Sequence, residues 1–238
     1  MCTLTYIPKG LKQFIITSNR DEQNQRPKAE LPVLHNINGV PIIYPLDPLG
    51  KGTWIATNSA YTLCILNGGF VPHIPTPPYK HSRGLVILHF FNYINVEDFI
   101  NNYSFENLEP FTLLITKHVA NTTLHEIVWD GKKPHLKMLD PIRPQIWSSA
   151  GLYTEEVREA RKALFDNWHA KLPDPVTQEI VSFHQFKGSP AGNDAILINR
   201  NNVIKTLSIT SVEHLNNQKH RMIYRDLDTS INTEVDID

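Results

Sequence analysis

Short apolar runs separated by turn residues recur along most of the 238-residue chain, and this pattern predicts β-strands arranged in hairpins. A first hairpin is predicted from strands at 3–7 and 14–17 around the turn Pro8-Lys9-Gly10. Asn38-Gly39 is typical of a second tight turn, between strands at 33–35 and 40–44. Further strands are expected at residues 53–57, 61–66, 111–116, 125–129, 135–139, 195–198, 203–210 and 222–224.

Helical periodicity is confined to a few segments. Ser82 is a predicted N-cap for a helix over 83–92, and a shorter helix is expected at 96–101. The clearest helix covers 155–170, with Thr154 as its predicted N-cap. Its apolar face is made by Val157, Ala160, Leu164 and Trp168. Paired strands with so few helices indicate an α+β fold rather than a repeat of βαβ units.

The composition indicates how many domains the chain forms and in which cellular compartment it is expected. Apolar residues make up 41% and charged residues 20%, which suits one large domain over 1–238 with an acidic tail, 226–238, that is expected to fray. The 23 basic and 24 acidic side chains nearly balance, so no nucleic-acid partner is expected. No apolar run approaches the roughly 20 residues of a membrane span, and the start lacks the plan of a secretory signal. With only two cysteines there is no disulfide framework, and a cytoplasmic location is expected.

The pair Met1-Cys2 is the first candidate for chemistry. Once Met1 is removed, Cys2 carries a thiol and a free α-amine on adjacent atoms. Such a residue can be a nucleophile and its own base, since an α-amine with a pKa of about 8 transfers protons near neutral pH. The other thiol, Cys64, lies in an apolar run and is expected to be a buried, inert core residue.

The run Asn19-Arg20-Asp21-Glu22 follows the second strand of the first hairpin. An antiparallel hairpin brings the end of its second strand back beside the start of its first. Arg20 and Asp21 are therefore expected near Cys2, where a cation lowers a thiol's pKa and a carboxylate orients an ammonium group. The alternative is a charged turn that closes a strand.

Cys2 followed by these four residues resembles the NRDE family, also called the TANGO2-like (transport and Golgi organisation 2) family. The resemblance covers about the first ninety residues and continues through Arg26-Pro27, Gly52-Thr53-Trp54, Asn67 and Ser82-Arg83-Gly84. That family is in turn similar to N-terminal-nucleophile hydrolases of the choloylglycine hydrolase and penicillin V acylase kind. The resemblance implies a four-layer αββα sandwich, with two mainly antiparallel sheets covered by helices, and cleavage of linear amide bonds by an N-terminal cysteine.

The resemblance also implies roles for individual residues. The Cys2 thiolate would attack an acyl carbon, its α-amine would relay the proton, and water would release the acyl group. Arg20 would stabilise the thiolate, and Asp21 would hold the α-amine. Asn67 is the candidate for binding the oxyanion, although a turn asparagine before two glycines has an equally good structural explanation.

Three further residues are assigned to substrate binding by the same resemblance: Asn19, Trp54 and Ser149. Trp54 is expected to be core or pocket wall. The family commonly has Gly-Leu-Ser-Asn before its long helix, whereas this chain has Trp147-Ser148-Ser149-Ala150. Ser149 takes the place of that asparagine and donates a weaker hydrogen bond, which puts the oxyanion site and amidase activity in doubt.

Three functions are compatible with these residues. The first is an N-terminal-cysteine hydrolase or acyltransferase acting on an amide or related acyl bond of a small molecule. The second is a non-catalytic binding or trafficking protein for a hydrophobic small molecule such as haem or acyl-CoA. The third is an interaction protein in which Cys2 is incidental. The eleven histidines form no His-x-x-x-His pair on a helix, so neither a metal nor a cofactor is expected.

The proline-rich segment 71–80 is expected to be an extended loop, either a pocket wall or a surface connection.

Overall fold

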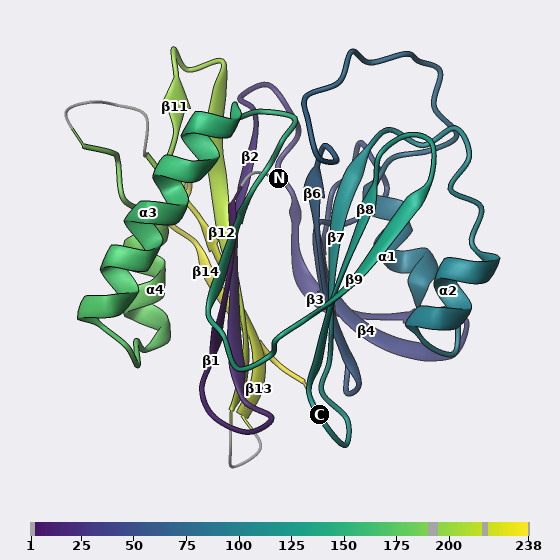
Figure 1. Ribbon diagram of the computed structural model, residues 1–238, viewed down its shortest axis with the longest axis horizontal. Helices are drawn as coiled ribbons and strands as arrows, with labels where there is room; N and C mark the ends of the chain where they lie inside the picture. Colours follow the sequence, from purple (N-terminus) through teal and green to yellow (C-terminus); the bar gives the residue numbers. More distant parts are fainter. Residues whose placement is uncertain (1–2, 190–194, 216–218, 238) are drawn as a thin grey trace.

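Two antiparallel sheets face each other in a computed structural model of the chain, which describes residues 3–189, 195–215 and 219–237 (Figure 1). Sheet A has the order β10-β1-β2-β12-β13-β14, with β11 paired to β12. Its strands are β1 (Thr3–Pro8), β2 (Phe14–Gln23), β10 (Gln145–Ser148), β11 (Asn199–Arg200), β12 (Ile204–Leu215), β13 (Lys219–Asp226) and β14 (Asn232–Asp236). Sheet B runs in sequence order. Its strands are β3 (Glu30–Ile37), β4 (Val40–Leu46), β5 (Ile55–Thr57), β6 (Tyr61–Asn67), β7 (Phe111–Lys117), β8 (Thr123–Trp129) and β9 (Pro134–Leu139).

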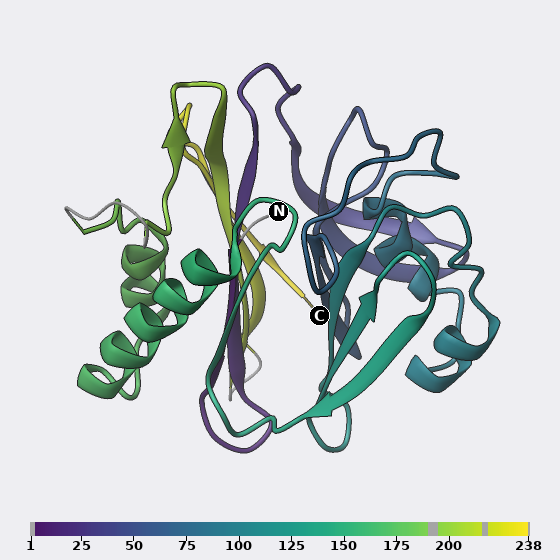
Figure 2. The same ribbon diagram turned by 45° about the horizontal axis from the view of Figure 1, so that its top comes forward.

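Helices cover the outer face of each sheet (Figures 1 and 2). Sheet A carries α3 (Glu155–Lys171) and α4 (Thr177–His184), and sheet B carries α1 (Gly84–Phe90) and α2 (Val96–Asn102). The predicted α+β sandwich with two antiparallel sheets and helical outer layers is therefore confirmed. In the part of the chain that the structure describes, no helix is both long and apolar enough to cross a bilayer.

Two apolar clusters hold these layers together. The larger one lies between the sheets and extends under α1 and α2, with Tyr6 and Phe14 from sheet A and Leu63 from sheet B. The smaller one lies between sheet A and the helices α3 and α4, and its centre includes Ile15 and Phe165. Each sheet is thus buried on both faces in its central part, which explains why its strands read as nearly continuous apolar runs.

The predicted hairpins are confirmed, with shifts at their ends. Asn38 and Gly39 have positive φ angles of 52° and 86° in the tight turn between β3 and β4. The run Asn19-Arg20-Asp21-Glu22 lies inside β2 rather than beyond it, because β12 pairs along the whole strand. This pairing excludes the interpretation of those residues as a charged turn.

Two predictions about secondary structure are wrong, and two observed elements were not predicted. The strand expected at 195–198 is wrong, since the only strand there within the described residues is the two-residue β11. The pattern predicted neither α4 nor β10. The tail after Asp226 was expected to fray, yet β14 pairs with β13 from Asn232 to Asp236. Its residues are mostly exposed, and the pairing supplies backbone hydrogen bonds that the polar composition does not reveal.

Candidate functional site

Strand β2 divides the Asn19-Arg20-Asp21-Glu22 motif between two faces of sheet A, because successive side chains on a strand point in opposite directions. Arg20 points between the two sheets, toward Trp54 and Asp47. Asn19 and Asp21 point to the other side, toward the layer of α3 and α4. At the end of the first hairpin, Thr3 pairs directly with Asn19. Cys2, the predicted nucleophile, lies outside the described residues.

Arg20 is a buried cation whose contacts are incomplete. Its side chain is 4% exposed, its guanidinium carbon lies 4.9 Å from the centre of the Trp54 ring, and Nη2 lies 3.8 Å from Oδ1 of Asp47. That last distance is too long for a hydrogen bond, and Nη2 has no hydrogen-bond partner among the described residues. Burial lowers the pKa of Arg20, while the negative charge of Asp47 opposes that change.

A cleft of about 110 Å³ opens beside Arg20. Its lining collects the motifs singled out in the sequence: Arg20, Glu22, Arg26, Asp47, Gly52, Thr53, Trp54, Ile65, Asn67, Ser82, Arg83 and Gly84. The segment 71–80 contributes no described residue to this lining, so it does not form the wall of this cleft. The cleft is therefore built by β2, the ends of the sheet B strands and the start of α1.

Other charged side chains of the cleft form closer ion pairs than Arg20 does. Arg26 donates through Nε at 3.0 Å and Nη2 at 2.5 Å to Oδ2 of Asp47. Burial alone would raise the pKa of Asp47, but the hydrogen bonds and charge of Arg26 hold it below its usual value. Arg83 pairs with Glu109 at 3.0 Å. Arg20 is thus the cation that faces the cleft with donor capacity to spare.

Two glycines of the motifs bring α1 close to sheet B. A Cβ on Gly52 would lie 2.4 Å from the carbonyl carbon of Gly84, and a Cβ on Gly84 would lie 2.8 Å from the Thr53 oxygen. Only glycine permits this backbone contact, which the hydrogen bond from Thr53 N to Gly84 O completes at 3.2 Å. Ser82 was predicted as the N-cap, but the cap position is Arg83, and Ser82 instead accepts from the Gly84 N–H.

Asn19 is fully occupied by structural hydrogen bonds. Its Nδ2 donates to the carbonyl oxygens of His184 at 3.1 Å and Ile196 at 3.0 Å, and its Oδ1 lies 2.8 Å from Nδ1 of His184. The other ring nitrogen of His184 contacts the hydroxyl of Thr5 at 2.8 Å. The side chain of Asn19 therefore joins β2 to α4 and to the segment before β11, and it points away from the cleft.

Asp21 is also held on the helical side. Tyr153 donates to its Oδ2 at 3.0 Å, and Thr206 donates to its Oδ1 at 2.5 Å. Arg20 and Asp21 thus project from opposite faces of β2. Their place beside Cys2 stays a prediction, because Cys2 lies outside the described residues. Asp21 is 1% exposed, and Thr206 lies next to the irregularity in the β2–β12 pairing.

Asn67 and Ser149 meet where the two sheets are joined. Ser149 follows β10 and donates through Oγ to the main-chain oxygen of Asn67 at 2.5 Å, and the N–H of Gly151 donates to the same oxygen at 3.2 Å. Gly68 has a φ of 89° and packs against the backbone of Gly151. The hydroxyl of Ser149 is therefore used in this junction, whereas Asn67 lies in the lining of the cleft.

Trp54 is both core and cleft wall, as expected. Its side chain is buried, and its Nε1 has no partner among the described residues. A buried indole N–H without an acceptor is unfavourable, which makes this donor of a cleft-lining residue a candidate for contact with a ligand. Burial raises the pKa of the Cys64 thiol to about 12, which confirms Cys64 as an inert core residue.

The sequence did not reveal a buried arginine on the other face of sheet A. Arg161 of α3 is 1% exposed, donates to Thr3 and to the Ala195 oxygen, and lies 3.7 Å from the centre of the Tyr153 ring. The expected apolar face of this helix is only half-buried, and Arg161 and Phe165 are its buried residues. Because arginine is normally on the solvent side of an amphipathic helix, periodicity could not identify it.

A larger cavity, of about 390 Å³, lies beside Arg161 and is lined by Lys187 and Arg200 as well. None of the motif residues is among its described lining residues. We therefore place the candidate site at the smaller cleft, because its lining collects the motif residues.

Three of the eleven histidines gather elsewhere, between the sheets. His118, His214 and His220 each offer one ring nitrogen within 4.8 Å of the others. They come from three separate strands or strand ends, so the search for a helical His-x-x-x-His pair could not detect them.

A family description of transport and Golgi organisation 2 matches residues 1–182 of the chain. The matched range contains the whole cleft, α3 and most of α4, and it ends before β11 to β14. No curated protein matches the sequence at a significant level.

Proposed function

Because the chain belongs to the Transport and Golgi organisation 2 family, we propose that it is an N-terminal-cysteine hydrolase or acyltransferase. Its substrate would be a small molecule with an amide or related acyl bond. The proposal takes Cys2 as the nucleophile after removal of Met1, and Arg20 as the group that activates it. A cytoplasmic location belongs to the same proposal, since a reduced thiol is required.

The observation that carries this proposal is the incompletely paired guanidinium of Arg20 at the end of the first hairpin. Thr3 and Thr5 of β1 contact Arg161 and His184 on the helical side. Cys2 itself lies outside the described residues. In the chain it directly precedes Thr3, which pairs with Asn19, the neighbour of Arg20.

A cation in that place favours the thiolate over the thiol and so supplies a nucleophile at neutral pH. The free α-amine of the same residue is the candidate proton carrier. Asp21 projects from the opposite face of the strand from Arg20, and we keep it as the candidate for holding the α-amine.

The acyl oxygen of a substrate would need hydrogen-bond donors in the cleft. Trp54 Nε1 and Arg20 Nη2 are both buried without partners among the described residues, and both residues line the cleft together with Asn67. A preorganised donor of this kind contributes roughly 10²–10³ in rate. We assign this role to Trp54 and Asn67, and we assign Ser149 and Asn19 to positioning the surrounding backbone. The cleft's volume of about 110 Å³ suits the acyl end of a ligand, with the remainder lying outside.

The test is an intact-mass measurement of the purified chain before and after incubation with a thioester acyl probe. We expect the mass of a chain without Met1 and a single fast adduct on Cys2. Cys64 is the internal control, because burial keeps its thiol protonated. Retention of Met1, or labelling of Cys2 no faster than that of denatured protein, would reject the catalytic role.

One observation favours a second function, the binding of a hydrophobic small molecule. A cavity of about 300 Å³ lies where β14 approaches β3 and β4. Its apolar lining consists of Leu34, Pro41, Ile43, Val235 and Ile237. Saturable binding of a fluorescent fatty acyl probe that Cys2→Ala leaves unchanged would support this function. Loss of that binding in Ile43→Asp, with the fold retained, would locate it to this cavity.

A further inference from the structure

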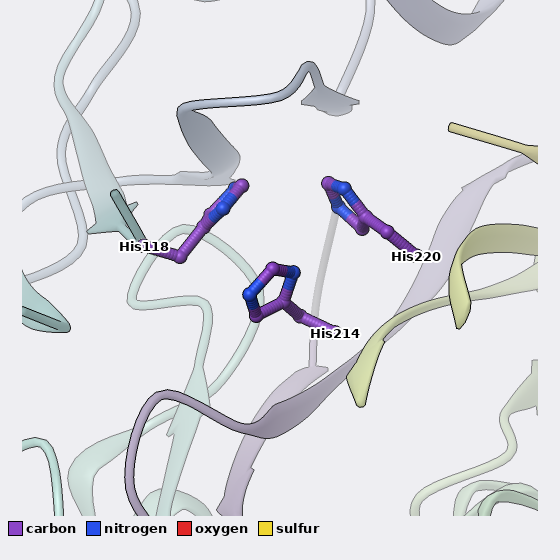
Figure 3. A group of neighbouring side chains, drawn as sticks. All are labelled: His118, His214 and His220. Atoms are coloured by element: carbon purple, nitrogen blue, oxygen red, sulfur yellow. The ribbon is translucent and has the colours of Figure 1, made fainter. Parts of the chain in front are cut away.

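Three imidazole rings converge between the two sheets, and they come from three separate places in the chain (Figure 3). His118 directly follows β7 of sheet B, whereas His214 and His220 belong to β12 and β13 of sheet A. The ring centres are 4.4 Å apart for His118 and His214, 4.9 Å for His118 and His220, and 4.8 Å for His214 and His220. Figure 3 shows the three rings pointing toward one another.

The surrounding structure holds each ring in place. His214 and His220 are directly opposite each other in the β12–β13 pairing, so their rings are cross-strand neighbours. The main-chain N–H of His118 donates to the Ala60 oxygen at 3.0 Å. Thr57 contacts Nε2 of His220 at 3.0 Å and is itself bonded to Thr62 at 2.9 Å. A hydroxyl that orients a histidine ring in this way is typical of the outer shell of a metal site.

Three ring nitrogens of the cluster are buried without a hydrogen-bond partner. His118 is 5% exposed, and neither of its ring nitrogens has a partner at hydrogen-bonding geometry; Nδ1 of His214 is likewise buried and unpartnered. A neutral imidazole always carries one N–H, so a buried ring without a partner leaves a donor and an acceptor unused. Phe14 stacks against His214, but this ring contact supplies no hydrogen bond to the unpartnered nitrogens.

Burial also keeps the three rings in the form that binds metals. It lowers the pKa of His118 to about 3, and the neighbouring His214 adds to this, although the main chain of Tyr61 opposes part of it. The pKa of His220 falls to about 3 for the same first reason, with contributions from His118 and His214, and burial lowers that of His214. A neutral imidazole has a lone pair available for a metal ion.

We propose that His118, His214 and His220 form a binding site for one Zn²⁺ ion, with a fourth position open to water or a small anion. Three histidines with one open position are a recurring ligand set for zinc. Among the described residues, the cluster contains three histidines and neither a carboxylate nor a cysteine, which favours zinc over magnesium or calcium.

The geometry requires only a local adjustment. Zinc–nitrogen bonds of about 2.0–2.1 Å in a tetrahedron separate the ligand nitrogens by roughly 3.4 Å. The nitrogens here lie within 4.8 Å of one another, so each ring would move by about 1 Å or less toward the centre. Rotation about the side-chain bonds supplies a movement of that size without a change in the strands.

This site is separate from the Arg20 cleft. His214 pairs with Phe14 at one end of β2, while Arg20 lies six residues further along the same strand. At about 3.3 Å per residue, the two places are roughly 20 Å apart. The zinc proposal therefore does not depend on the proposed activity of Cys2.

The experiment is a Zn²⁺ titration of the chelator-treated full chain by calorimetry, followed by Co²⁺ substitution and visible absorption. We expect one Zn²⁺ per chain and the intense absorption of tetrahedral Co²⁺. The variant is His214→Gln, chosen because His214 is the least buried of the three rings. Its matched control is His125→Gln, which changes a buried strand histidine outside the cluster.

The affinity for Zn²⁺ should fall at least 100-fold in His214→Gln and stay within threefold in the control, with both variants retaining the circular dichroism of the parent chain. Equal affinity in the two variants, or no saturable binding by the parent, would overturn the proposal. X-ray absorption of the zinc-loaded parent needs no variant. Three nitrogen ligands at about 2.0–2.1 Å would support the site, and a shell with sulfur or carboxylate ligands in their place would overturn it.

Discussion

The two faces of β2 differ in how completely their polar groups are bonded. On the helical face, Asn19 makes three hydrogen bonds and Asp21 accepts two, and both side chains are almost wholly buried. On the face between the sheets, Arg20 has only a long ion pair with Asp47, and one of its nitrogens is unpartnered. One four-residue motif therefore contains residues that stabilise the fold and a residue whose bonding is incomplete.

This difference distinguishes polar residues that stabilise the fold from one that is a candidate for chemistry. A buried polar group with all its partners contributes to stability, and its removal leaves those partners unsatisfied. A buried cation without full pairing lowers stability and is retained where it has another use. We therefore expect substitutions on the helical face to unfold the protein and substitution of Arg20 to affect reactivity instead.

Acidification should lower the free energy of unfolding through the buried His184 of α4, and this is the largest effect that we expect. Burial lowers the pKa of His184 to about 3, and the positive Arg161 adds to this. The folded protein thus keeps His184 neutral, while the unfolded chain binds a proton below about pH 6.5. Stability is complete above that pH and falls on acidification by about 1.4 kcal/mol per pH unit for each such histidine.

The measurement is urea unfolding between about pH 6.5 and pH 5.5, a window in which ordinary carboxylates remain ionised. His118 and His220 contribute the same sign there. His184→Gln should reduce the slope by about one proton relative to the parent. An unchanged slope in His184→Gln would show that His184 is already protonated in the folded protein.

Asn19→Leu should give the next largest effect. The substitution leaves two buried carbonyl oxygens and a ring nitrogen of His184 without partners, so the free energy of unfolding should fall by about 3 kcal/mol or more. Chemical denaturation measures this change, with Gln25→Leu as the control on an exposed amide. A loss below about 1 kcal/mol would contradict the structural role of Asn19.

Arg20→Met should have the opposite profile. Methionine fills much of the same space without a buried charge, so stability should stay within about 1 kcal/mol of the parent. The acylation rate of Cys2 should fall by roughly 10- to 100-fold, because the thiolate loses its cation. Arg26→Met is the matched control in the same cleft, and an equal fall in both variants would assign the effect to the general field of the cleft.

Ser149→Ala tests the junction between the sheets and should give the smallest effect. It removes one hydrogen bond to the Asn67 oxygen, which the Gly151 N–H still contacts. The free energy of unfolding should fall by about 1 kcal/mol, with no change in the acylation rate of Cys2. A large loss of rate with unchanged stability would instead make Ser149 a donor to the substrate. Ser59→Ala, on an exposed loop, is the control.

Local patterns predicted most of the fold because each hairpin carries its own signals. Short apolar runs between turn residues located the strands of sheet B, and Asn38-Gly39 located a tight turn with positive φ angles. The sequence failed to predict elements whose formation depends on a neighbouring element. The strand β14 is polar and mostly exposed, and its pairing with β13 depends on a neighbour rather than on its own residues.

The sequence predicted several residues of the site but not how these residues are arranged. The motifs identified Arg20, Trp54 and Asn67, which do line one cleft. The contacts of Asn19 with His184, 165 residues away, and the burial of Arg161 depend on how α3 and α4 pack on sheet A. The same limit applies to His118 and His214, which approach each other only after the two sheets have packed.

The most direct test of the central claim is the rate of alkylation of Cys2 as a function of pH, measured in the parent chain and in Arg20→Met. Cys64 does not interfere, since its buried thiol remains protonated across the working range. The account predicts an apparent pKa for Cys2 below that of an ordinary cysteine in the parent, and a return toward the ordinary value in Arg20→Met. The same apparent pKa in both proteins would contradict the activation of Cys2 by Arg20.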